Sequence, residues 1–316
     1  MTPRPLGRTG LSAAPLMLGG NVFGWTADRA ESFAILDAFV DSGGSLIDTA
    51  DVYSAFAPGN VGGESETIIG EWLRHSGRRN DVLIGTKVGL MDGRGGTGLH
   101  PARIMGAVEE SLQRLGVETI DIYFAHRDDP STPLEESLEA FDRLVREGKV
   151  RVLGASNYAP DRLETALAIS DANGWARFAV IEPLYNLLQR DVYEGALQDI
   201  ALREGLAVVP FYALANGLLT GKYRSVEDIA GHAREPYLRP LFERPEVPRL
   251  IAAMDRVAQD TGASMVSIAV AWMLTRPGIS APIASVSRPG QLGDLIAGPT
   301  LDLDAAHRAL LDEAAA

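Results

Sequence analysis

Four side chains that can carry charge or move a proton occur at or just after the ends of apolar segments. They are Asp48, Tyr53, Lys87 and His126. A tyrosine has an ordinary pKa of about 10, so it keeps its proton at neutral pH, and a nearby cation favours the phenolate and lowers that pKa. We therefore expect Tyr53 to be a proton donor that is activated by Lys87, with Asp48 orienting Lys87.

His126 completes this set, because an imidazole can donate a hydrogen bond to the oxygen of a substrate carbonyl group. A carbonyl group that receives hydride at carbon also needs a proton at oxygen, so the four residues together suit carbonyl reduction. Taken singly, each residue also has an ordinary structural interpretation. Asp48 could be a helix cap, Tyr53 a half-buried aromatic residue, Lys87 a loop lysine and His126 a structural histidine. The hypothesis therefore depends on the fold bringing them together.

The pattern of the whole chain predicts how these residues are positioned. Apolar segments typical of strands alternate with amphipathic segments typical of helices. One such helix is predicted to have Thr132 as its N-cap and Pro133 as its first residue. Leu134, Leu138 and Phe141 then lie on one face of this helix. The predicted strands span residues 15–19, 45–48, 82–86, 120–124, 150–155, 178–182, 207–210 and 281–284.

Eight β-then-α units favour a closed (β/α)8 TIM barrel of the α/β class over an open sheet. Residues 6–11 are typical of a small N-terminal β-hairpin that caps the bottom of this barrel. No long linker or low-complexity segment is visible, so we expect one domain over residues 1–316. In such barrels the reactive side chains lie at the carboxyl ends of the strands, where the four residues occur.

Composition narrows the function. The net charge of −13 disfavours a nucleic-acid partner, and the longest apolar run, residues 266–274, is too short to cross a membrane. Cysteine is absent, which excludes disulfides and thiolate chemistry and favours a cytoplasmic location, as does a start without an apolar signal segment. The histidines lack metal-ligand spacing, so no metal is expected; they are residues 75, 100, 126, 232 and 307.

Four segments resemble those of the aldo-keto reductases, in the same order. They are residues 46–54 (LIDTADVYS), 85–87 (GTK), 120–126 (IDIYFAH) and 148–157 (GKVRVLGASN). The resemblance covers nearly the whole chain. It implies that Asp48, Tyr53, Lys87 and His126 form a catalytic tetrad, and that the chain is an NADPH-dependent oxidoreductase acting on a small aldehyde or ketone.

Two further segments, residues 210–223 (PFYALANGLLTGKY) and 286–292 (VSRPGQL), resemble the cofactor regions of that family. The resemblance implies that Phe211 stacks on the nicotinamide, that Lys222 lies near the pyrophosphate and that Arg288 holds the 2′-phosphate, which favours NADPH over NADH. The implied cofactor-binding residues are Gly20, Asn21, Ser156, Asn157, Glu182, Phe211, Leu214, Asn216, Gly217, Lys222, Ser287, Arg288 and Gln291.

Three departures from the family pattern put cofactor affinity in question. Glu182 stands where relatives usually have glutamine, Leu295 stands where many have an asparagine that reads adenine, and Ala213 replaces a common proline. The substrate is not specified. Trp25, Phe56 and Tyr212 are candidates for a pocket that takes a hydrophobic or aromatic carbonyl compound, or they simply pack loops. We also expect residues 91–99 and 224–247 to shape specificity.

Other interpretations remain open at this stage. Residues 93–98 (GRGGTG) match a dinucleotide-binding pattern, but they do not begin at a strand end, so we interpret them as a mobile loop on the substrate side. One alternative function is a regulatory subunit that binds NADPH with little turnover. Another is a lyase in which Lys87 forms a Schiff base. The oligomeric state is not indicated.

Overall fold

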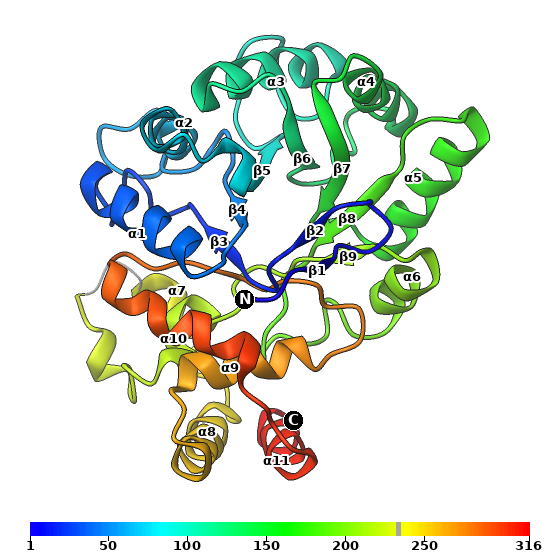
Figure 1. The fold of residues 1–316 in the computed structure, drawn as a ribbon. Helices are drawn as coiled ribbons and strands as arrows, with labels where there is room; N and C mark the ends of the chain where they lie inside the picture. Colours follow the sequence, from blue (N-terminus) through cyan, green and yellow to red (C-terminus); the bar gives the residue numbers. More distant parts are fainter. Residues whose placement is uncertain (232–234) are drawn as a thin grey trace.

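Eight parallel strands form the central sheet of the computed structural model, which describes residues 1–231 and 235–316 (Figure 1). The strands are β3 (Met17–Gly19), β4 (Leu46–Asp48), β5 (Leu83–Val88), β6 (Ile120–Ala125), β7 (Val150–Ser156), β8 (Phe178–Glu182), β9 (Ala207–Val208) and β10 (Ile283–Ala284). They pair in the order β10-β3-β4-β5-β6-β7-β8-β9. Each coincides with a strand predicted from the sequence.

Backbone hydrogen bonds join the two ends of this sheet and close it into a barrel. Ser280 N donates to Val208 O at 2.8 Å, and Ile283 N donates to Pro210 O at 2.8 Å. On its other side, Ile283 pairs with Met17 of β3. The predicted (β/α)8 barrel is therefore confirmed, and the carboxyl ends of its strands meet at one mouth.

Helices follow the strands and cover the outside of the barrel (Figure 1). Those that follow β3 to β8 are α1 (Arg29–Asp41), α2 (Glu64–Ser76), α3 (Pro101–Leu115), α4 (Leu134–Arg146), α5 (Pro160–Asn173) and α6 (Ala196–Glu204). Between β9 and β10 lie α7 (Glu235–Phe242), α8 (Val247–Thr261) and α9 (Met265–Leu274), and α10 (Leu292–Ala297) and α11 (Ala305–Ala315) follow β10.

Helix α4 illustrates how the sequence determines these elements. Leu134, Leu138 and Phe141 recur at helical spacing, and all three are buried against the barrel. The predicted helix start is wrong by one residue, because Pro133 is the N-cap. The hydroxyl of Thr132 instead donates to Asp129 Oδ2 at 2.9 Å, within the preceding loop.

The interior of the barrel is filled by side chains, and Phe124 of β6 is the largest of them near the mouth. It pairs in register with Lys87 of β5 and Gly154 of β7, and Gly85 of β5 also lies against its ring. A β-carbon at Gly154 would lie 2.3 Å from the Phe124 ring, and one at Gly85 would lie 3.1 Å from it. A side chain at Gly154 would therefore collide with this ring, which lies 5.7 Å from Lys87 Nζ.

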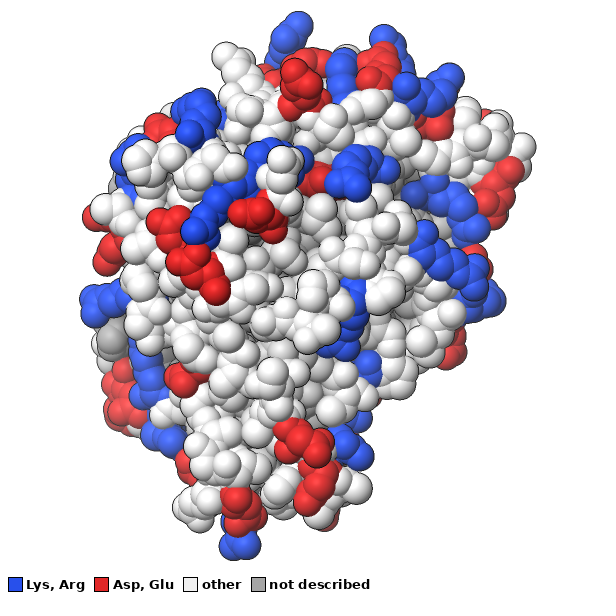
Figure 2. Space-filling view, viewed as in Figure 1, with Lys and Arg blue, Asp and Glu red and all other residues white. Residues whose placement is uncertain are grey.

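The predicted N-terminal hairpin closes the other end of the barrel. Its strands, β1 (Arg4–Pro5) and β2 (Ser12–Ala13), pair antiparallel. Gly7 in the turn has a φ of +51° and lies so close to β9 that a β-carbon would be 2.5 Å from Ala207 N. The hairpin crosses in front of the barrel in Figure 1, and Figure 2 shows this face with acidic and basic side chains interspersed around a largely uncharged centre.

Two absences hold for the part of the chain that the structure describes. None of its helices combines the length and apolar character that crossing a membrane requires. Nor do its histidine, aspartate and glutamate side chains form a group of three that could hold a metal ion. His232 lies outside the described residues.

Candidate active site

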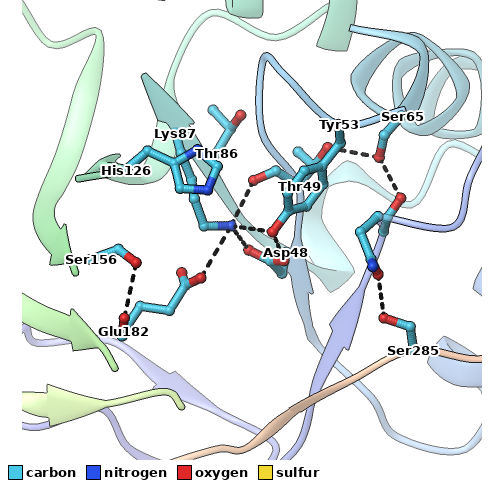
Figure 3. Close-up of polar contacts among 12 residues, drawn as sticks. Asp48, Thr49, Tyr53, Ser65, Thr86, Lys87, His126, Ser156, Glu182 and Ser285 are labelled. Atoms are coloured by element: carbon cyan, nitrogen blue, oxygen red, sulfur yellow. Dashed lines mark hydrogen bonds and ion pairs between the residues drawn. The ribbon is translucent and has the colours of Figure 1, made fainter. Parts of the chain in front are cut away.

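Lys87, near the end of β5, is the centre of a buried group that we call the lysine cluster: Asp48, Tyr53, Lys87 and Glu182 (Figure 3). The ammonium Nζ donates to Asp48 Oδ1, to Tyr53 Oη at 2.9 Å and to Thr49 O at 3.0 Å. It also forms an ion pair with Glu182 Oε1 at 3.4 Å. Tyr53 Oη in turn donates to Asp48 Oδ2 at 2.9 Å. The side chain of Lys87 has 0% exposed surface.

The barrel brings these residues together from separate strands. Asp48 pairs in register with Gly85, two residues before Lys87, so the two side chains lie on the same face of the sheet, with Lys87 two residues nearer the mouth. Glu182 ends β8 and reaches the ammonium from across the barrel (Figure 3). The backbone oxygen of Glu182 accepts a hydrogen bond from Ser156 Oγ at 2.9 Å, which joins the ends of β7 and β8.

Tyr53 and Lys87 both have raised pKa values in this cluster, so both side chains keep their protons. Burial, followed by the charges of Asp48 and Glu182, raises the pKa of Tyr53 well above its ordinary value. Our prediction of a lowered pKa for Tyr53 is therefore wrong for the protein alone, because burial and then the charges of two carboxylates outweigh the effect of one ammonium. Burial by itself would lower the pKa of Lys87, but the same carboxylates reverse the effect and raise it. A lysine held protonated is a poor nucleophile, which disfavours the Schiff-base interpretation.

His126, directly after β6, faces the same space as a neutral imidazole. Burial, and then the positive charges of Lys87 and Arg127, lower the pKa of His126 well below its ordinary value. Its ring centroid is 6.0 Å from that of Tyr53. Its Nδ1 is buried and has no hydrogen-bond partner among the described residues. A neutral imidazole can orient an oxygen atom by a hydrogen bond but cannot supply an imidazolium proton.

A second buried group of charges, which we call the arginine cluster, anchors the loop that carries Tyr53. Its members are Asp51, Glu66, Arg103, Glu110 and Arg114. Arg103 donates to Asp51 Oδ2 at 3.0 Å and to Glu110 Oε2 at 2.9 Å, and its side chain is fully buried. Arg114 donates to Glu66 Oε2 at 2.6 Å. Burial, with the charge of Glu66, raises the pKa of Asp51 to about 7.

A cavity of about 730 Å³ opens beside the lysine cluster. The predicted site residues that line it are Asn21, Trp25, Asp48, Tyr53, Phe56, His126, Ser156, Asn157, Glu182, Phe211, Tyr212, Leu214, Asn216 and Gly217. At its outer part the rings of Trp25 and Phe56 meet edge to face, with 4.9 Å between their centroids. The structure thus brings most of the predicted catalytic, cofactor and substrate residues to one cavity.

The backbone around this cavity is unusual. Asn157, Tyr212 and Asn216 all have a positive φ, between 56° and 58°, although none is glycine. Such left-handed conformations cost free energy in residues with side chains and gather at functional sites. Asn157 is held by two hydrogen bonds from its Nδ2, to His126 O at 3.0 Å and to Ser156 Oγ at 2.9 Å.

Several predicted residues lie outside the lining of this cavity. Gly20 is packed directly behind it, with its N–H donating to Asp48 O at 2.7 Å. The more distant residues are Lys222, Ser287, Arg288 and Gln291, of which Gln291 Oε1 accepts from the backbone N–H groups of Ser287 and Arg288. Leu295 is fully buried in α10, so its side chain is not presented to a ligand.

The loop after β5 differs from its prediction. Leu90 lines the cavity but residues 91–99 do not, so the expectation that these residues face the substrate is wrong. The glycine pattern in this loop serves to pack it onto the start of α3: a β-carbon at Gly95 would be 1.9 Å from Ala102 O.

Some lining residues were not predicted individually. They include Leu90, Arg127, Ala213, Tyr237 and residues 283–285. Arg127 directly follows His126, and its position after a strand end was a signal that sequence reasoning could have used. Tyr237 belongs to α7 and lies within residues 224–247, which we expected to shape specificity, but the sequence did not single it out from that segment.

Comparisons with known proteins agree with this geometry. A sequence model of the Aldo/keto reductase family matches residues 15–316. The aldo-keto reductase YhdN of Bacillus subtilis is 32% identical over 307 residues, covering 93% of this chain and 88% of its own length. The L-glyceraldehyde 3-phosphate reductase of Escherichia coli O157:H7 is 31% identical, with 92% and 86% covered. A probable voltage-gated potassium channel subunit beta of Arabidopsis thaliana is 29% identical, with 92% and 89% covered.

Proposed function

The chain belongs to the aldo/keto reductase family, and from that premise we propose that it is an NADPH-dependent oxidoreductase that reduces an aldehyde or ketone to an alcohol. In this proposal Asp48, Tyr53, Lys87 and His126 are the catalytic residues. The observation that carries it is the 2.9 Å hydrogen bond from Lys87 Nζ to Tyr53 Oη, at the wall of a cavity that Tyr53 lines.

The proposed roles follow from the protonation states of these side chains. When bound, a nicotinamide cofactor would supply hydride to the carbonyl carbon, and Tyr53 would supply the proton to the carbonyl oxygen. The phenol keeps its proton until the oxygen becomes alkoxide-like, because an alkoxide is a stronger base than a phenolate. Lys87 then stabilises the phenolate, Asp48 holds Lys87 in place, and His126 orients the carbonyl oxygen.

The cavity has features that fit a nicotinamide cofactor. Ser156, Asn157 and Phe211 line it next to the lysine cluster, where they would hold the nicotinamide group. The left-handed backbone at Asn216 and Gly217 leaves room for close approach of a pyrophosphate to the main chain. Lys222 and Arg288 supply positive charge farther out. Within the described part of the chain, the Arg288 guanidinium forms no ion pair, which leaves it available for a 2′-phosphate.

The substrate pocket in this proposal is the outer part of the cavity. Trp25 and Phe56 form one aromatic wall, and Tyr212 contributes a second ring that contacts Phe211 at 5.0 Å between centroids. Phe56 and Tyr212 are exposed. Exposed aromatic groups around a polar centre suit the apolar part of a small carbonyl compound.

The direct test is the substitution Tyr53→Phe. It removes the proton donor and leaves the ring, so we expect the rate of aldehyde reduction to fall at least about a hundredfold. Turnover is measured by the loss of NADPH absorbance with a panel of aldehydes, ketones and sugars. NADPH binding, measured by fluorescence titration, should change little. A variant that retains full activity would show that Tyr53 is not the donor.

The preference for NADPH is tested separately with Arg288→Ala. Losing a charge-assisted contact to the 2′-phosphate should weaken NADPH binding about tenfold. The affinity for NADH, which lacks this phosphate, should stay nearly unchanged. Equal losses for the two cofactors would remove the proposed role of Arg288 and with it the basis for the preference.

A second function, as an NADPH-binding regulatory subunit with little turnover, is favoured by one observation. One relative is named as a probable voltage-gated potassium channel subunit beta and matches over 92% of this chain. The turnover panel separates the two proposals, because a regulatory subunit should bind NADPH yet leave every carbonyl compound unreduced.

A further inference from the structure

Glu182 is a buried acid that the proposed chemistry does not use. Its side chain lines the cavity at the end of β8 and is only 3% exposed. Oε1 lies 3.4 Å from Lys87 Nζ. The other oxygen, Oε2, is buried and has no hydrogen-bond partner among the described residues. Burying an oxygen of this kind is costly unless a ligand or a proton satisfies it.

Among the described residues, one cation forms an ion pair with Glu182. Lys87 of β5 is that cation, and it is shared with Asp48 of β4, which contacts Nζ directly. The other titratable groups at the cavity beside the cluster are the phenols of Tyr53 and Tyr212, the neutral imidazole of His126 and the guanidinium of Arg127, whose charge acts on His126. Burial, followed by the charge of Asp48, raises the pKa of Glu182 to about 8, although Lys87 opposes this.

The cluster therefore has two states near neutrality. With Glu182 protonated, the charges of Asp48 and Lys87 cancel, and Oε2 can carry a hydrogen-bond donor. With Glu182 ionised, the cluster carries one net negative charge at the cavity wall. The charge of a nicotinamide ring also differs between two states, because the oxidised ring is a cation whereas the reduced ring is neutral. The ionised cluster would therefore attract the oxidised ring more strongly than the reduced ring.

We propose that Glu182 makes this site discriminate between oxidised and reduced cofactor, with its ionised carboxylate favouring NADP⁺ and its protonated form removing that preference. The inference rests on the proposed cofactor function. It deepens that function by assigning to one residue a control over which redox form of the cofactor stays bound.

The ratio of two dissociation constants isolates this effect. NADP⁺ and NADPH share the adenosine, the pyrophosphate and the 2′-phosphate, so contacts to those groups cancel in the ratio and only the charge of the ring differs. A unit charge several ångströms from a carboxylate, in a partly buried site, is worth about tenfold in affinity or more. By linkage, NADP⁺ binding near pH 8 should also release a proton.

The experiment measures both dissociation constants by fluorescence titration between pH 6 and pH 9.5. In the unsubstituted protein, the ratio Kd(NADP⁺)/Kd(NADPH) should fall about tenfold as pH rises across this range. In Glu182→Gln, which keeps the shape but cannot ionise, the ratio should stay flat. The matched control is Glu118→Gln, which removes the same charge from an exposed position at the opposite end of the barrel, before β6. This control should follow the unsubstituted protein.

A flat ratio in the unsubstituted protein would overturn the inference without reference to any variant, so the result does not depend on how well Glu182→Gln folds. A slope that persists in Glu182→Gln would overturn it as well, by assigning the effect to another group. If the unsubstituted protein binds neither nucleotide, the proposed function fails together with this inference. Tight binding without a pH-dependent ratio refutes the inference alone.

Discussion

The lysine cluster and the arginine cluster are both buried groups of charges attached to the same loop after β4, yet they are built for different purposes. In the lysine cluster one ammonium serves two carboxylates and a phenol, and the group opens onto a cavity. In the arginine cluster the two guanidiniums of Arg103 and Arg114 hold three carboxylates by hydrogen bonds, and Asp51, Glu66 and Arg103 do not line the cavity.

This difference between the two clusters follows from the type of cation that each contains. A guanidinium presents several donors in a fixed plane and never gives up its proton, so it ties segments together. Arg103 connects Asp51 of the loop with Glu110 of α3 in this way. An ammonium is a compact charge whose influence depends on the acids around it, so Lys87 can stabilise a charge that appears and disappears on a neighbouring phenol.

We expect the largest effect on the free energy of unfolding from Arg103→Met, which tests whether the arginine cluster supports the fold. The variant leaves Asp51 buried without its partner, and breaking a buried pair from one side costs about 3–5 kcal/mol. The free energy of unfolding, measured by denaturant titration, should fall by that amount. The rate constant per folded molecule should change far less than in Tyr53→Phe.

Either of two results would break the comparison. A free energy of unfolding within about 1 kcal/mol of the unsubstituted protein would mean that the arginine cluster does not support the fold. A loss of turnover as large as that of Tyr53→Phe, in protein that is still folded, would mean that the two clusters act as one.

A smaller effect concerns pH. Because the pKa of Asp51 is raised to about 7 from an ordinary value of 3.8, the folded protein binds a proton that the unfolded chain has already lost in this range. This carboxyl therefore contributes stability below about pH 4, and the contribution is lost as pH rises to about 7, by at most about 4 kcal/mol. Asp51→Asn cannot ionise and should lack this part of the decline.

The measurement is the free energy of unfolding of both proteins between pH 4 and pH 8. The control is Asp302→Asn, an exposed position where the same charge is lost. Parallel pH profiles for Asp51→Asn and the unsubstituted protein would show that Asp51 is ionised in the folded state throughout. The charges of Arg103 and Arg114 would then offset the burial of Asp51 more fully than we infer.

The sequence predicted the barrel and the lysine cluster's location for a clear physical reason. Strand periodicity locates strand ends, and a closed barrel brings those ends to one mouth, so the sequence alone predicts that Asp48, Lys87 and His126 converge. The direction of the pKa shift of Tyr53 was not predictable in this way, because it depends first on how deeply the fold buries the phenol, and then on the charges of Asp48 and Glu182.

Other features also depended on packing over long distances. Residues 91–99 follow β5 directly and were expected at the cavity, but the glycines of this segment pack it against α3 instead. Tyr237 reaches the cavity from α7 through contacts between segments far apart in the sequence. Local patterns specify which elements form, whereas loop positions follow from packing that no short segment encodes.

The two glycines beside Phe124 affect how the lysine cluster exchanges protons with solvent. Gly85 and Gly154 leave space for the phenyl ring of Phe124, which places an apolar ring 5.7 Å from Lys87 Nζ. Three other members of the lysine cluster, Asp48, Tyr53 and Glu182, line the cavity. A ligand bound in the cavity would therefore shield the cluster from solvent and slow its exchange of protons with water.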